Sequence, residues 1–225
     1  LSADKQAQLK SVLSFEGNTA EITRMTDVGP SIGTELYRKS LVAIVLVVLS
    51  ILVYLAFAFR KPSSDKKDKK EEHNDDVSSW WYGMIAVITL IHDIIVPTGV
   101  IAILGHYTGA QVDTLFITAL LTILGYSVND TIIILDRVRE NIRNNAKAKE
   151  KHSFEYLVGK GLTETYGRSI NTSVSALLSL AALYAFGPES THIFALTLIV
   201  GVVVGTYSSI FLAAPLLVAI RNRQK

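Results

Sequence analysis

The chain has 225 residues, of which 49% are hydrophobic, and it carries a formal net charge of only +2. It contains no cysteine, which excludes a disulfide framework, a thiol nucleophile and thiolate metal sites. The near-neutral charge gives no indication of a nucleic-acid partner. Because the apolar residues lie in long blocks, we predict an all-α polytopic membrane protein.

Residues 1–39 precede the first apolar block and have the character of a small piece of an α+β domain. The stretch "SADKQAQLKSVLSF" favours a helix, and "AEITRMT" favours a strand in which Ile22 alternates with polar neighbours. So short a segment buries too little apolar surface to fold alone. We therefore expect residues 1–39 to be the C-terminal remnant of a larger domain, with further sequence upstream.

Five apolar blocks are long enough to cross a bilayer, which takes about 20 mostly apolar residues in a helix. Together they predict a transmembrane domain over residues 40–225, with spans at 40–59, 83–104, 114–135, 169–186 and 193–220. The segment 60–82 contains the charged run "KPSSDKKDKKEEHNDDVSS" and is predicted to be a solvated linker beside the membrane. In the last block, Gly201 and Gly205 have the spacing that permits close helix contact.

The distribution of basic residues predicts the orientation. Lys and Arg cluster in the linker 60–82, after the third block and in the C-terminal tail, whereas residues 105–113 and 187–192 contain none. The positive-inside rule therefore places the linker and the C-terminus in the cytoplasm and residues 1–39 outside. The five Lys and Arg residues within 1–39 conflict mildly with this orientation. A further helix upstream would remove the conflict.

The segment "GYSVNDTIIILDRVREN" places Asn129 and Asp130 inside the third block. A charged side chain at the bilayer centre costs roughly 2.5–3.5 kcal/mol on insertion, so such groups mark pathways or buried partners. Asp130 lies six residues before Asp136, where a run of charged residues begins, and six residues span about 9 Å along a helix. Because a short Asp side chain cannot reach water from that depth, Asp130 is the leading candidate site residue.

Two further polar sites lie in the apolar blocks. Arg168 enters the fourth block from the same side as Asp130, and Thr172 lies one helical turn deeper on the same face. Because the third and fourth blocks run antiparallel, Asp130 and Arg168 can lie at similar depth. Such a pair suits a proton relay in which the carboxylate titrates, or a static ion pair that fixes helix register. His92 and Asp93, in the second block, form a candidate secondary polar site.

Several motifs resemble the SecF family of protein-export membrane subunits. The segment "GYSVNDTIIILDRVREN" is similar to the signature of that family, and "VGPSIGTEL" to the segment that joins its external domain to its second helix. "IHDIIV", the Arg168 region with "NTSVSALL", and "GTYSSIFLAAPL" are similar to later helices, so the resemblance covers nearly the whole chain in order. The charged loop from Lys61 to Ser79 looks longer than is usual in the family.

The resemblance implies a six-helix bundle similar to the RND exporters, with the first helix and most of the external domain preceding this chain. It implies a subunit of the cytoplasmic (inner) membrane that uses the proton-motive force to assist preprotein translocation. The implied partners are SecD, the channel subunits SecY, SecE and SecG, the translocating preprotein and membrane lipids. Protons would be the coupling ion, with no cofactor, metal or covalent chemistry. Asp130, beside Asn129, resembles the proton-carrying carboxylate, and Arg168 and Thr172 match positions of the same relay.

Three other functions are compatible with the residues. An intramembrane aspartyl protease would use Asp93 and Asp130 as a dyad that shares one site, although nothing in the spacing requires this. A structural subunit would only hold SecD or the channel. An RND-type transporter subunit would move another cargo. Whether Asp130 and Arg168 touch is the observation that narrows these alternatives most.

Overall fold

Helices make up the regular structure of this chain as far as the computed structural model describes it, over residues 30–58, 79–109, 112–147 and 152–223. No strand occurs among these residues. Two units are distinguished, residues 1–43 and 44–225, and the helix bundle described below belongs to the second. The predicted α+β remnant and the charged linker fall mostly outside the described residues.

Within the part of the chain that the structure describes, five helical stretches are long and apolar enough to cross a membrane, as predicted. The elements are α2 (Pro30–Ala58), α3 (Ser79–Thr108), α4 (Thr114–Lys147), α5 (Phe154–Phe186), the 3-10 turn η1 (Glu189–Thr191), α6 (His192–Ser208), the π-helix η2 (Ser209–Ala213) and α7 (Ala214–Arg223). Helices α4 and α5 contain 34 and 33 residues. At 1.5 Å per residue each is about 50 Å long, which exceeds the roughly 30 Å hydrocarbon core of a bilayer. Both helices therefore extend beyond the membrane.

Short polar and glycine signals set the helix ends. The Asp113 carboxylate accepts hydrogen bonds from the backbone N–H groups of Leu115, at 2.9 Å, and Phe116, at 3.2 Å, and so caps α4. The Ser153 hydroxyl caps α5 by accepting from the N–H of Tyr156. After α3 the chain turns at Gly109, whose positive φ of 71° favours glycine. These residues mark the end of α3 and the starts of α4 and α5.

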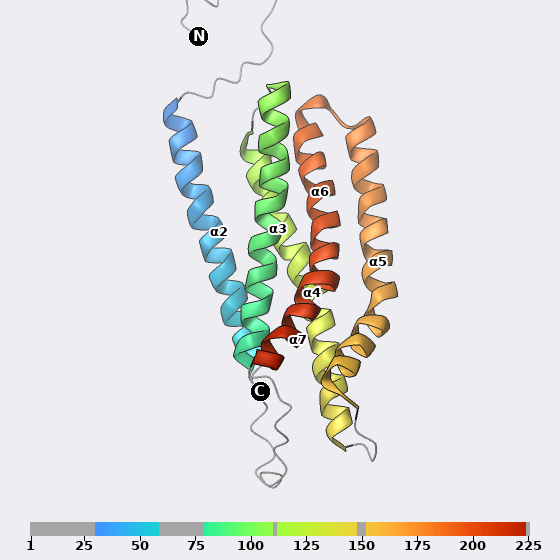
Figure 1. Ribbon diagram of the computed structural model, residues 1–225. Coiled ribbons are helices and arrows are strands. Elements are labelled where there is room, and N and C mark those ends of the chain that lie inside the picture. The colour runs from blue at the N-terminus through green and yellow to red at the C-terminus, as the bar shows by residue number, and fades with distance from the viewer. Residues whose placement is uncertain (1–29, 59–78, 110–111, 148–151, 224–225) are drawn as a thin grey trace, which may run out of the picture. The chain divides into compact units, whose positions relative to one another are not determined.

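Helices α3, α4, α5 and α6 lie side by side, and successive helices run in opposite directions (Figure 1). Helix α4 packs against α3, α5 and α6, and α6 also packs against α3 and α5. Two buried apolar clusters form along the bundle, one that includes Ile123 and Leu198 and one that includes Leu135 and Leu217. Residues that lie between these clusters are enclosed by four helices.

A π-helix interrupts the last spanning segment, which the sequence predicts as one continuous helix. Pro215 lacks a backbone N–H, and in an α-helix its ring would clash with the carbonyl of Phe211. The wider π-helical turn at Ser209–Ala213 relieves this clash, and short π-helical segments inside α-helices are frequent at functional sites. Pro97, inside α3, likewise leaves the carbonyl of Asp93 without an α-helical donor. Both proline irregularities thus lie beside the polar layer described next.

Candidate functional site

Asp93 is a fully buried carboxylate on α3, with none of its surface exposed. Its Oδ2 atom accepts hydrogen bonds from the hydroxyls of Ser127 on α4 and of Ser208 on α6, the latter at 2.7 Å. Its Oδ1 atom lies 2.9 Å from Nδ1 of His92. Three side chains from three helices therefore converge on one carboxylate. Such convergence offsets much of the cost of burying it.

Asp130 is a second buried carboxylate, with 4% of its surface exposed, and it lies on α4. Its Oδ1 atom accepts a hydrogen bond of 2.9 Å from the Ser169 hydroxyl on α5. Its Oδ2 atom lies 3.5 Å from the Ser209 hydroxyl at the start of η2, which is the outer limit of a hydrogen bond. Asp130 is thus less completely surrounded by donors than Asp93.

The two carboxylates form one layer across the bundle, which we call the carboxylate layer: Asp93, Ser127, Asp130, Ser169, Ser208 and Ser209. Ser208 and Ser209 are consecutive, yet each faces a different carboxylate. Ser127, which contacts Asp93, precedes Asp130 on α4 by about one turn. The layer lies between the two buried apolar clusters.

Small residues allow α4 and α6 to approach closely at this layer. A Cβ added at Gly205 would lie 3.1 Å from Cβ of Ser127, and one added at Gly201 would overlap the side chain of Ile123. The close contact that the sequence predicts for this glycine pair is therefore confirmed. At this contact Ser127 on α4 and Ser208 on α6 both donate to the same oxygen of Asp93.

The predicted relay residues are brought together only in part. Asp130 and Arg168 form no ion pair; the neighbour of Arg168, Ser169, contacts Asp130 instead. Arg168 is exposed on the bundle surface but near enough to interact electrostatically with Asp130. Asn129 and Thr172 are exposed too, and the Thr172 hydroxyl donates to the backbone carbonyls of Arg168 and Ser169, each at 3.0 Å. The expected similar depth of the two segments is right, but the direct pair is absent.

A second set of hydroxyls forms hydrogen bonds that do not include Asp130. The Tyr126 hydroxyl donates to Oγ of Ser173 at 3.1 Å, and Ser173 lies 2.5 Å from the Thr206 hydroxyl. These contacts join α4, α5 and α6. The hydroxyl of Thr131, directly after Asp130, is buried and has no hydrogen-bond partner among the described residues. A buried polar atom left without a partner costs about 1–3 kcal/mol.

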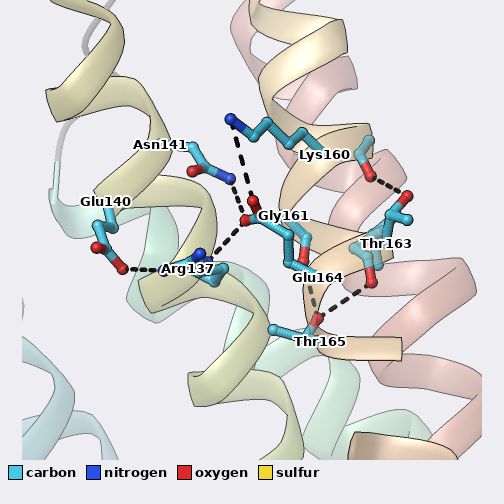
Figure 2. Close-up of polar contacts among 10 residues, drawn as sticks. Arg137, Glu140, Asn141, Lys160, Gly161, Thr163, Glu164 and Thr165 are labelled. Carbon is cyan, nitrogen blue, oxygen red and sulfur yellow. Dashed lines mark hydrogen bonds and ion pairs between the residues drawn. The ribbon is translucent and has the colours of Figure 1, made fainter. Parts of the chain in front are cut away.

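Charged residues pair with one another where α4 ends and α5 begins (Figure 2). Nε of Arg137 lies 2.7 Å from Oε2 of Glu164, and Nη1 of Arg137 lies 2.6 Å from Oε2 of Glu140. Asn141 donates to the same oxygen of Glu164 at 2.9 Å, and Lys160 lies 4.0 Å from its other oxygen. We call this group the charged cluster. Next to it, a Cβ on Gly161 would lie only 2.7 Å from Val138, so the helices touch there.

The geometry bears on the protease alternative and on metal binding. Asp93 and Asp130 make no direct hydrogen bond; serines lie between them, so they do not form the shared-proton dyad of an aspartyl protease. Over the described ranges, no group of three His, Cys, Asp or Glu side chains is placed to hold a metal ion. What the layer offers chemically is two buried carboxylates whose partners on other helices are serine hydroxyls.

The four serines are the site residues that sequence reasoning missed. Ser208 and Ser209 stood out only as small residues suited to packing, Ser169 only as one of the polar residues that follow Arg168, and Ser127 carried no signal of its own. Their roles depend on which helix faces which. A consecutive Ser-Ser pair between a glycine pair and a proline in an apolar span was the one available hint.

The family model described as "Protein export membrane protein SecD/SecF, C-terminal" matches residues 8–64 and 78–223. Among curated proteins, the chain is 41% identical over 222 residues to a protein translocase subunit SecF of Thermobaculum terrenum, covering 99% of this chain and 64% of that protein. It is 38% identical to the protein translocase subunit SecF of Synechocystis, covering 87% of this chain and 55% of that protein. The chain thus spans less than two thirds of these relatives.

Solved structures with the same arrangement include those of SecDF. The translocon-associated membrane protein SecDF from Thermus superposes with a TM-score of 0.75 at 31% identity, over 99% of this chain and 27% of that one. SecDF in its super-membrane-facing form gives a TM-score of 0.71 at 28% identity, over 100% of this chain and 27% of that one. The fold and the sequence therefore agree on the relationship.

Proposed function

This chain belongs to the SecD/SecF family of protein-export membrane proteins, and we propose that it forms the membrane-embedded part of a SecF-type subunit that assists preprotein translocation. It is a multi-pass membrane protein, and we propose the cytoplasmic membrane as its location, with the C-terminus in the cytoplasm. In this proposal protons are the coupling ion and Asp130 binds them. The observation that carries it is a buried carboxylate, enclosed by four helices, whose hydrogen-bond partners are neutral hydroxyls.

Neutral partners suit a group that must gain and lose a proton. A serine hydroxyl can donate to an ionised carboxylate and can accept from a protonated one, so both states of Asp130 find a partner. A buried ion pair would instead leave an uncompensated cation whenever the carboxylate was protonated. One elementary charge that crosses 100 mV releases about 2.3 kcal/mol, more than the 1.4 kcal/mol that changes a conformational equilibrium tenfold.

The exposed residues beside Asp130 supply the route by which protons would reach it. Asn129 and Arg168 are exposed, and neither forms a side-chain hydrogen bond or ion pair within the described residues. Both groups are costly against lipid tails, so they need water or a protein partner. We assign Asn129, Arg168 and Thr172 to this route. The Arg168 guanidinium would stabilise the ionised form of Asp130 after a proton has left, and Thr172 lies on the same face as Arg168.

A long polar face supports a protein partner for this side of the bundle. It runs in helical register along two neighbouring helices and contains Thr118, Thr122, Gly125 and Asn129 on α4 and Arg168, Thr172, Ser175 and Ser179 on α5, all exposed. The hydroxyls donate back to their own helices, so the amide and the guanidinium are what require cover. We propose SecD as that cover, with SecY, SecE and SecG, the preprotein and lipids as further partners.

Other functions fit these observations less well. A scaffold subunit needs no buried carboxylates with neutral partners, because apolar packing alone is at least as stable. A protease would need the dyad that the two aspartates do not form. An RND-type transporter of another cargo would share the proton site and differ only in what is moved, and the relatives named translocase subunits favour export.

The test is Asp130→Asn in the full-length protein, with Asp136→Asn as the matched control. Both substitutions remove one carboxylate from α4, but Asp136 is exposed, beyond the apolar stretch. We expect Asp130→Asn to lower proton-driven stimulation of preprotein export in reconstituted vesicles by more than tenfold, and Asp136→Asn to change it by less than about twofold. The amounts of protein and of assembled complex are measured alongside.

Full stimulation by the Asp130→Asn protein, at normal assembly, would contradict proton binding at Asp130. Equal loss in both variants would show that the assay reports charge or expression in general. A cargo other than a preprotein would be indicated if proton uptake depended on Asp130 while export did not respond.

A further inference from the structure

Two consecutive serines connect the carboxylates of the carboxylate layer. Ser208, the last residue of α6, contacts Asp93, and Ser209, the first residue of η2, faces Asp130. Because one peptide unit joins them, the position of one hydroxyl constrains the other. The two carboxylates make no direct hydrogen bond, but each contacts one of two residues that are consecutive in the chain.

Each of these hydroxyls has a second acceptor on its own helix. Oγ of Ser208 lies 2.7 Å from Asp93 and 3.1 Å from the carbonyl of Gly205. Oγ of Ser209 lies 3.5 Å from Asp130 and 3.0 Å from the carbonyl of Thr206. A hydroxyl has one proton to donate, so Ser208 is committed to its carboxylate while Ser209 favours its own helix. The contact of Ser209 with Asp130 is therefore the weaker of its two contacts.

We propose that Asp93 is a positioning residue, which holds Ser208 and thereby sets how readily Ser209 donates to Asp130. Asp93 is itself anchored by Ser127 and His92, so it is fixed from α3 and α4 as well as from α6. The π-helix that begins at Ser209 gives this part of the chain a backbone in which a small shift moves the second hydroxyl without unwinding the helix. This inference rests on the proposed proton binding at Asp130.

Arg168 on α5 is the charged group that interacts electrostatically with Asp130 among the described residues. The other titratable groups of the carboxylate layer and its adjoining contacts are Asp93, with its partner His92, on α3 and Tyr126 on α4, and Ser208–Ala213 contains none. Substituting Asp93 therefore changes both a charge and a position. Substituting Ser208 changes only the position, because its hydroxyl does not contact Asp130. Ser208 is accordingly the residue on which the test is built.

The experiment measures how the reactivity of Asp130 depends on pH in the full-length protein in native membranes. Dicyclohexylcarbodiimide modifies protonated carboxylic acids in apolar surroundings, and mass spectrometry of the peptide that contains Asp130 reports the extent of reaction. We expect Ser208→Ala to move the half-reaction pH upward by at least about half a unit, a threefold change in proton affinity, because Ser209 is then no longer held in place through Ser208 and donates less readily to ionised Asp130. Ser208→Thr keeps the hydroxyl and should restore the wild-type profile.

Two further variants separate positioning from general damage. Thr89→Val removes another buried hydroxyl, one that donates only to its own helix α3, and should leave the profile unchanged. In an Asp93→Leu background, Ser208→Ala should add no shift, because its partner is already gone. A wild-type profile for Ser208→Ala, or an undiminished shift in the Asp93→Leu background, would overturn the role of Asp93.

The same data distinguish failure of the inference from failure of the proposed function. If Asp130 of the wild-type protein reacts equally at every pH tested, proton binding at Asp130 is wrong, and the inference falls with it. If Asp130 titrates and Asp130→Asn loses coupling, but Ser208→Ala changes nothing, only the positioning role is wrong.

Discussion

Carboxylates occur in two regions of this bundle, and their partners differ in kind. In the carboxylate layer, Asp93 and Asp130 receive hydrogen bonds from serine hydroxyls on neighbouring helices. In the charged cluster, farther along α4 and near the start of α5, Glu140 and Glu164 pair with Arg137 (Figure 2). The same two helices, α4 and α5, carry residues of both regions.

The difference indicates which carboxylates are free to change their protonation state. Hydrogen bonds from Asn141 and Arg137 lower the pKa of Glu164, so Glu164 stays ionised at neutral pH and joins α5 to α4 without changing its protonation state. An aspartate among hydroxyls keeps a partner in either state, so protonation reorganises hydrogen bonds without leaving a bare charge. We therefore expect the carboxylate layer to govern function and the charged cluster to govern only stability.

The largest effect is expected from disturbing the packing that makes the carboxylate layer. Gly201→Ala adds a methyl group that overlaps Ile123, whose branched side chain is 1% exposed and has no room to turn away. Overpacking of this kind costs about 1–3 kcal/mol. We expect a clear loss of thermal stability in detergent together with loss of export stimulation.

Gly99→Ala is the matched control, because a Cβ there meets nothing within 4 Å. Alanine is favoured over glycine in a helix by up to about 1 kcal/mol, so this change should leave stability equal or higher. If the Gly99 and Gly201 variants behaved alike, close packing of α4 and α6 would not be what holds the carboxylate layer.

An intermediate effect is expected from the cations on α5. Arg168→Ala removes a positive charge near Asp130, whereas Lys160→Ala removes one from the charged cluster. We expect Arg168→Ala to lower proton-driven export stimulation by about tenfold and Lys160→Ala to lower it less than twofold. Vesicle assays at matched protein amounts measure both. Equal losses of export stimulation in the two variants would mean that the carboxylate layer and the charged cluster do not differ in function.

The sequence predicts much of the fold because membrane insertion leaves a strong local pattern. Each span is a block of apolar residues whose length is set by the bilayer, so the five segments can be located without knowledge of their neighbours. The π-helix was not predicted, although Pro215 marks the place, because the sequence does not specify how a helix absorbs a proline. It is a response to packing as well as to the missing N–H group.

The site was predicted less completely, for a related reason. A carboxylate in an apolar block is conspicuous, and Asp130 and Asp93 are both buried as their positions indicate. Their partners are serines, which are common in membrane helices and bond equally well to their own backbone. Helix rotation decides that Ser169, and not the adjacent Arg168, points at Asp130. A turn of 100° per residue separates these outcomes, and sequence spacing alone did not resolve it.

The smallest effect is expected from Glu164→Gln in the charged cluster. Glu164 precedes the predicted fourth span, on the part of α5 that extends beyond the membrane. Hydrogen bonds from Asn141, and then from Arg137, hold the pKa of the Glu164 carboxyl below its usual value of 4.5. The side chains of Arg137 and Glu164 are 39% and 28% exposed, so solvent screens the pair. We expect a fall in Tm of no more than a few degrees and unchanged export stimulation.

The pH dependence of that small effect tests its origin. Because the pKa of Glu164 is lower in the folded protein than in the unfolded one, its contribution is complete above the unfolded pKa and is lost as the pH falls through the folded pKa. Thermal unfolding of the wild-type and Glu164→Gln proteins should therefore differ most near neutral pH and converge on acidification. A difference that stayed constant with pH would mean that the glutamine is simply a poorer fit. Loss of export stimulation in the Glu164→Gln protein would mean that the charged cluster takes part in coupling, and that the division between the two regions is wrong.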